Sequence, residues 1–114
     1  MATRVMIVGD HAYAGCTGLV ADSGDNEKLQ GSFFVRVDPP RELGTPVSRR
    51  QAVVINGKEP EMVQVVSGRY NGMKGTVIGI SGSSLELYFG DINPLKIEVP
   101  ATDVVALEKM AVAG

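Results

Sequence analysis

VQVVSGRYNGMKGTVIGI, residues 63–80, is the stretch that decides how this chain folds. It begins with Val63 and Val65, whose period-two spacing indicates a strand with one buried face. It ends with a second apolar run from Val77. Between the two runs stand Gly68, Gly72 and Gly75. Glycine adopts the positive φ that a tight connection between antiparallel strands needs, so the stretch predicts a strand, a turn and a strand.

The same pattern occurs a second time, near the start of the chain. RVMIVGDHAYAGCTGLV, residues 4–20, aligns without a gap on EMVQVVSGRYNGMKGTV, residues 61–77. The offset is constant at 57 (65 − 8 = 57). The identities that it aligns are Val8 with Val65, Tyr13 with Tyr70, Gly15 with Gly72, Gly18 with Gly75, and Val20 with Val77. Such self-similarity predicts a structural unit that occurs twice.

A second ungapped block supports the repeat. Residues 33–55 align on residues 85–107 at an offset of 52, so the first copy has five extra residues (57 − 52) in the polar loop 22–31. An insertion in a surface loop costs little free energy. The strands that we expect are 4–9, 16–22, 33–37, 43–47 and 52–55 in the first copy, and 62–67, 74–80, 85–89, 95–99 and 104–107 in the second.

Strands this short, separated by turns that contain Gly and Pro, predict an all-β chain of two small antiparallel barrels. The domains that we expect are a first barrel at 1–57, a second at 58–108 and a C-terminal tail at 109–114. The boundary at 56–60 (NGKEP) is a turn dipeptide followed by polar residues and a Pro. Because this linker is short, the two barrels should touch.

The quoted stretch resembles the KOW motif, whose pattern is an alternating strand, a Gly, a basic or aromatic turn, and then G-x-x-G-x-V. The residues that meet it are Val63, Val65, Gly68, Gly72, Gly75 and Val77. Residues 87–107 are similar to the remaining strands of the KOW domain in NusG-type transcription elongation factors. The resemblance implies tandem SH3-like barrels of five strands, with Gly18 and Gly75 where a strand bends. The first copy departs from the pattern at His11, which stands opposite Gly68.

Composition narrows the classes of function. The chain carries 11 basic and 13 acidic residues and a net charge of −2, so it lacks the overall basic footprint of a non-specific nucleic-acid binder. One cysteine excludes an internal disulfide and fits a reducing compartment. No apolar run approaches the ~20 residues of a membrane span, and no signal peptide is evident. We expect a cytoplasmic protein, or one of the virion or host cytoplasm if it is viral.

Catalysis and metal binding are not expected. No nucleotide-binding loop, dinucleotide fingerprint, nucleophile elbow or paired-carboxylate pattern is found. His11 and Cys16 bracket a turn, but a zinc site needs about four ligands, and the chain has no further His or Cys. The acidic stretch 22–27 lacks the EF-hand spacing. We predict a non-enzymatic protein without a cofactor or a small-molecule substrate.

The candidate binding residues are basic or aromatic. They are Arg69, Tyr70, Asn71 and Lys74 in the second copy's first turn, the adjacent pair Arg49 and Arg50, and Lys96. Tyr70 could stack on a base while Arg69 and Lys74 meet phosphates. In the alternative reading Tyr70 covers the end of the barrel, since Tyr13 recurs at the same repeat position. The candidate structural turn glycines are Gly15, Gly18, Gly68, Gly72 and Gly75.

Two hypotheses of function stay open from the sequence. KOW domains bind RNA or dock on RNA polymerase, ribosomal proteins or other factors, so the resemblance implies contact with RNA or a ribonucleoprotein machine of transcription or translation. The alternative is a structural or adaptor protein that docks other proteins, such as an accessory or decoration protein of a viral or other large assembly. The low net charge and apolar residues such as Met73 and Leu95 favour this second hypothesis.

Overall fold

The computed structural model describes residues 3–20, 32–90 and 95–107, so the tail 109–114 and the acidic stretch 22–27 lie outside the described residues. The described chain is all-β and has no α-helix, which confirms the predicted class. The first unit comprises β1 (Arg4–Ile7), β2 (Thr17–Val20), β3 (Ser32–Val37), β4 (Gly44–Ser48), the 3-10 helix η2 (Arg49–Gln51) and β5 (Ala52–Val54). The second comprises β6 (Met62–Val65), β7 (Lys74–Ser81), β8 (Ser84–Phe89), β9 (Leu95–Pro100), the 3-10 helix η3 (Ala101–Asp103) and β10 (Val104–Ala106).

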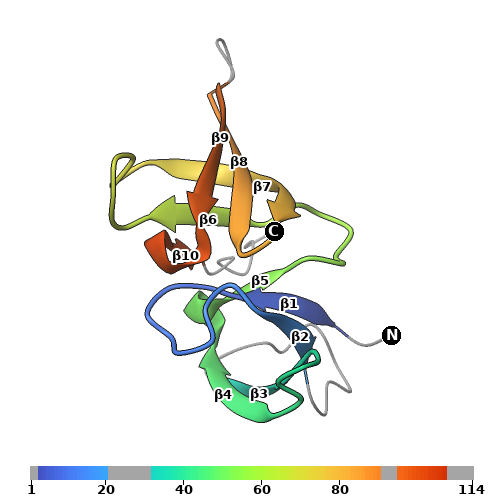
Figure 1. Cartoon of the computed structure of the whole chain (residues 1–114). Coiled ribbons are helices and arrows are strands. Elements are labelled where there is room, and N and C mark those ends of the chain that lie inside the picture. Colours follow the sequence, from blue (N-terminus) through green and yellow to red (C-terminus); the bar gives the residue numbers. More distant parts are fainter. Residues whose placement is uncertain (1–2, 21–31, 91–94, 108–114) are drawn as a thin grey trace.

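The ten strands form two five-stranded antiparallel sheets that share one topology. Their orders are β4-β3-β2-β1-β5 and β9-β8-β7-β6-β10. In each unit a 3-10 helix leads from the fourth strand to the fifth, which then pairs with the first. Figure 1 shows the two sheets stacked, with β1 and β5 of the first unit facing the second unit.

The strand registers confirm the repeat offset of 52. Ser32 pairs with Ser48 in the first sheet, and Ser84 pairs with Pro100 in the second (84 − 32 = 52 and 100 − 48 = 52). The two 3-10 helices are related by the same offset, since η2 begins at Arg49 and η3 begins at Ala101. The second half of the unit therefore repeats without insertion or deletion.

The offset of 57 is wrong over the first strand. Val5 pairs with Gly18, and Val63 pairs with Gly75. The glycines differ by 57 (75 − 18), whereas the valines differ by 58 (63 − 5). The first unit thus has one residue more between its first two strands, and the structural counterpart of Val65 is Ile7 rather than Val8.

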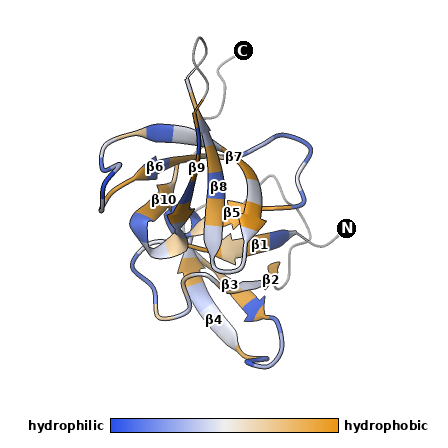
Figure 2. Ribbon diagram, turned by 45° about the horizontal axis from the view of Figure 1, so that its top comes forward, coloured by the Kyte–Doolittle hydropathy of each residue, from blue (hydrophilic) through white to orange (hydrophobic). Residues whose placement is uncertain are grey.

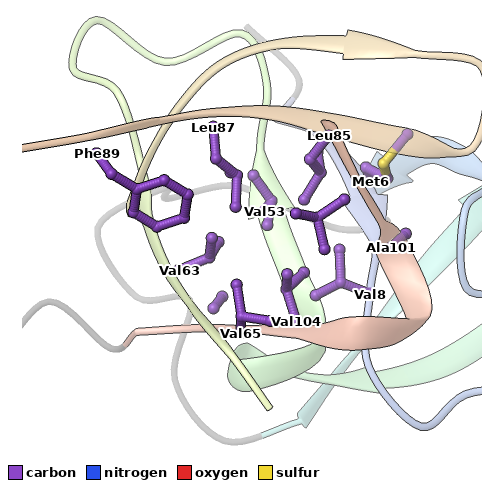
Figure 3. Close-up of a cluster of buried hydrophobic side chains, with 12 residues drawn as sticks. Met6, Val8, Val53, Val63, Val65, Leu85, Leu87, Phe89, Ala101 and Val104 are labelled. Atoms are coloured by element: carbon purple, nitrogen blue, oxygen red, sulfur yellow. The ribbon is translucent and has the colours of Figure 1, made fainter. Parts of the chain in front are cut away.

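The hydrophobic core consists of two clusters, and β1 contributes to both. Val5 and Ile7 face the first cluster, which lies within the first unit. Met6 and Val8 face the opposite way, because successive side chains on a strand point to opposite faces of the sheet. Together with Val53 of β5 they enter the second cluster, where they pack among side chains of the second unit (Figure 3).

The second cluster is therefore shared between the units. Its buried members from the second unit are Val63, Val65, Leu85, Leu87, Phe89, Val99, Ala101, Val104 and Ala106. The three side chains from the first unit, Met6, Val8 and Val53, are fully buried against them. The expectation that the two units touch is confirmed, and the contact is part of a core.

Candidate functional site

The β6–β7 turn presents most of the predicted binding residues. The Gly72 N–H donates to the Val65 carbonyl at 2.7 Å, which closes the turn at the end of β6. Gly72 has φ of 96°, in the left-handed region that favours glycine. On the other side of the turn, the Ser67 hydroxyl donates to Asp103 Oδ1 at 2.7 Å, and the Val66 N–H donates to the Asp103 carbonyl. The turn is thus held in one conformation.

Four candidate side chains lie on or beside this turn. The Arg69 guanidinium carbon lies 5.9 Å from the centre of the Tyr70 ring, within the range of a cation–π contact. Tyr70 is half-buried and packs on the shared cluster. This agrees with the alternative in which the ring covers apolar side chains. Arg69, Asn71 and Lys74 are exposed. Figure 2 shows the turn, between β6 and β7, largely in hydrophilic colours. It offers one cation over a half-buried ring and a second, Lys74, at the start of β7.

The β1–β2 turn of the first unit has a similar aromatic feature. The Arg41 guanidinium carbon lies 5.7 Å from the centre of the Tyr13 ring, although Arg41 comes from the β3–β4 connection. His11 supports this turn, because its Nδ1 accepts the Tyr13 N–H at 3.0 Å and its Nε2 lies 3.0 Å from the Pro46 carbonyl oxygen. With Nδ1 accepting, Nε2 is the ring nitrogen that can donate to the Pro46 carbonyl. Both of its ring nitrogens are occupied by the fold.

Cys16 and His11 do not form a hydrogen-bonded pair. It is half-buried, and it packs on the first cluster beside the Tyr13 turn. Among residues 3–20, 32–90 and 95–107, no three acidic, His or Cys side chains are grouped as metal ligands.

The two turns lie against the same 3-10 helix. Gly9, at the start of the first turn, donates its N–H to the Ala101 carbonyl at 2.8 Å. Ser67, at the start of the second turn, bonds to Asp103. Both turns therefore flank η3, and Figure 1 shows the two loops on one side of the molecule. A ligand that touches one turn could extend toward the other.

Arg49 does not belong to this exposed surface. Its Nη2 lies 2.6 Å from Glu61 Oε1, and its Nη1 donates to the Ala52 carbonyl at 2.7 Å. The side chains of Arg49 and Glu61 are only 11% and 8% exposed. Glu61 Oε1 also accepts the Val54 N–H. Arg49 thus joins η2 to Glu61, directly before β6, and a ligand could reach it only by breaking that pair.

The remaining two basic candidates are dispersed. Arg50 is exposed on η2. Lys96 lies on β9, opposite Tyr88, and its Nζ is 3.0 Å from Glu86 Oε2. The structure therefore does not gather the pair Arg49 and Arg50 and Lys96 into one strip. Of the candidates, only the group around the β6–β7 turn forms a compact surface.

The structural glycines serve two purposes. Gly15, Gly68 and Gly72 have positive φ, as turn residues. Gly18 and Gly75 are required by close packing, because a Cβ at Gly75 would lie 2.6 Å from the Phe89 ring and one at Gly18 would collide with the Arg36 carbonyl. The space at these two strand positions is filled by the neighbouring strand.

Sequence reasoning missed a groove at the far end of β7. It has a volume of about 360 Å³ and lies between the linker and the last residues of β7. Its walls include Val54 and Ile55 from the first unit, Pro60 from the linker, and residues 77–80 of β7. The alternation of Ile78 and Ile80 was visible in the sequence, but nothing there indicated that β6 would end before reaching them.

Comparison with known proteins finds no family model that matches the chain and no curated protein with significant similarity to it. In the part of the chain that the structure describes, none of the helices has the length and apolar character required to cross a membrane.

Proposed function

We propose that this chain is a non-catalytic binding module of two KOW-like, SH3-like barrels that contacts RNA or a ribonucleoprotein machine through the β6–β7 turn. One observation carries the proposal: Arg69, over the Tyr70 ring, and Lys74, at the start of β7, are both exposed on a turn that hydrogen bonds hold in place. Cations and an aromatic ring in this arrangement suit the phosphates and bases of a single strand.

The surface is small, which limits the affinity expected of it. Arg49 is paired inside the fold with Glu61, whereas Arg4 and Lys96 are paired at its surface with Asp38 and Glu86. Few phosphates could therefore be neutralised at one time, so binding should be weak and should depend on salt. The turn of the first unit, with Arg41 over Tyr13, would extend the contact.

The test compares RNA binding of the wild type with that of a double variant, Arg69→Ala with Lys74→Ala, at low and moderate salt. The wild type should bind single-stranded RNA at low salt and lose affinity as salt rises, whereas the double variant should not bind. Arg36→Ala with Lys58→Ala is the matched control, because both residues are exposed and the change in charge is the same. No binding by the wild type at low salt would overturn the proposal.

A second candidate function is docking of another protein, including service as an accessory or decoration protein of a viral or other large assembly. The observation that favours it is the exposure of large apolar side chains, among them Phe34 at 59%, Ile78 at 52% and Leu95 at 48%. Pull-down with and without nuclease separates the two functions. Partners that nuclease removes favour RNA, and partners that it leaves favour protein docking.

A further inference from the structure

β7 extends beyond the strand that covers its edge. The β6–β7 ladder ends where Met62 pairs with Thr76, followed by one bond from the Val77 N–H to the Glu61 carbonyl at 2.8 Å. Residues 79–81 pair with β8 on one side, after the bulge at Ile78. Among the described residues, no strand pairs with residues 78–81 on the other side. An open strand edge offers backbone donors and acceptors to a further strand.

The groove described above lies along this open edge. The linker, which ends at Pro60 just before β6 begins, forms the opposite wall. Ile78 and Ile80 are 52% and 40% exposed there. A volume of about 360 Å³ is at the lower end of the range for ligand sites, which suits one or two apolar side chains.

The groove continues the contact between the two units. Ile55 and Val77, which line it, also pack on the shared cluster. Ile55 comes from the first unit and Val77 from the second, so the groove lies at one end of the contact between the units. A segment that enters it would extend a contact that the fold already makes.

We infer that this groove binds an extended segment of another protein, which adds as a strand to residues 78–81 of β7. The backbone of the segment pairs with the open edge, and its alternate apolar side chains enter between the linker and β7. The β-bulge between Val77 and Gly79 offsets the ladder, so only a short segment pairs. This site lies at the opposite end of β7 from the β6–β7 turn, and the inference does not depend on RNA binding.

The test uses synthetic heptapeptides as probes, in which Thr alternates with Val, Ile, Leu or Phe between terminal lysines. Titration of the whole chain should shift the backbone amide signals of residues 54–57 and 77–80 at up to millimolar peptide. Methylation of the peptide backbone nitrogens should abolish these shifts, because it removes the donors that strand pairing needs. Shifts that survive methylation, or no shifts with any probe, would overturn the inference.

Two variants locate the site. Ile80→Glu places a charge in the groove and should weaken binding about tenfold or more. Met62→Glu is the matched control: Met62 is 48% exposed but does not line the groove, so binding should be unchanged. Circular dichroism checks that both variants fold. If the wild type self-associates and Ile80→Glu abolishes that association, the groove binds a second copy of this chain. That result would overturn the inference. Arg69→Ala with Lys74→Ala should leave peptide binding intact, which separates this test from that of RNA binding.

Discussion

Arg49 and Glu61 form an ion pair between the units, and the loss of either residue should weaken the junction. Their pair is nearly buried, and Glu61 also holds the Val54 N–H. Removing one partner leaves a buried charge uncompensated, which costs about 3 kcal/mol or more. We expect Arg49→Met to lower the free energy of unfolding in urea by that amount, and Arg49→Met with Glu61→Leu to recover part of it.

The control for that prediction is the exposed pair of Lys96 and Glu86. The Lys96 side chain is 65% exposed, so Lys96→Ala should change the free energy of unfolding by less than about 1 kcal/mol. Equal effects of Lys96→Ala and Arg49→Met would contradict the structural role of Arg49.

Asp38 gives the fold a dependence on pH. Its Oδ2 accepts from Arg4 at 2.5 Å and from the Thr17 hydroxyl at 2.6 Å, and these two hydrogen bonds hold the pKa of the carboxyl below its usual 3.8. A carboxyl with a lowered native pKa stabilises the fold above its unfolded pKa, and this stability is lost as pH falls through the native pKa. Unfolding free energies measured from pH 6 downward should therefore decline below about pH 4, and less steeply in Asp38→Asn. Parallel curves for the two proteins would show that Asp38 is not responsible.

At the scale of the elements, Gly18 and Gly75 set how closely adjacent strands approach. A Cβ at Gly18 would lie 2.8 Å from Val35 Cγ1 and still closer to the Arg36 carbonyl oxygen. Because backbone cannot move as a flexible side chain does, Gly18→Ala should cost about 1–3 kcal/mol in urea denaturation. Gly44→Ala is the control, since its Cβ would meet only Phe34 at 4.0 Å, and it should be almost neutral. A small effect at both positions would count against the close-packing role.

The sequence predicted the strands closely but misjudged one register. Wherever the structure describes both, the expected strand ends lie within two residues of the observed ends. β1 is apolar on both faces, because one face packs in each cluster. Its sequence pattern therefore does not show which residues face which side, and so does not fix the register. For that reason, the sequence alone does not distinguish an alignment of Val65 with Val8 from one with Ile7.

The candidate site was predictable only in part. The turn residues Arg69 to Lys74 are contiguous, so any turn keeps them together. An adjacent arginine pair predicts an exposed surface, and the structure instead places the Arg49 side chain at 11% exposure. The repeat did indicate that Arg49 could be buried, since the offset of 52 places it opposite Ala101. The structure shows that Ala101 is buried. The groove depends on where β6 ends relative to β7, and local sequence does not determine that.

At the scale of the whole molecule, the shared cluster should make the two units unfold together. Met6 belongs to the first unit but is fully buried among side chains of the second. Met6→Ala should therefore cost about 2–5 kcal/mol and lower the stability of both sheets. Amide signals of Gly18 and Gly75 report the two sheets separately by NMR, and they should disappear at one urea concentration. Survival of either signal beyond the other would show that the units unfold independently.

Translation gives the two units an order of assembly. A chain grows from its amino end, so β1 and β5 emerge from the ribosome before any strand of the second sheet. Until the second unit is synthesised, the side chains of Met6, Val8 and Val53 lack the partners against which they pack in the shared cluster. The second unit must then fold against these three side chains, so the first unit acts as its template. A substitution on that face of β1 would thus impair the packing of strands that are synthesised half a chain later.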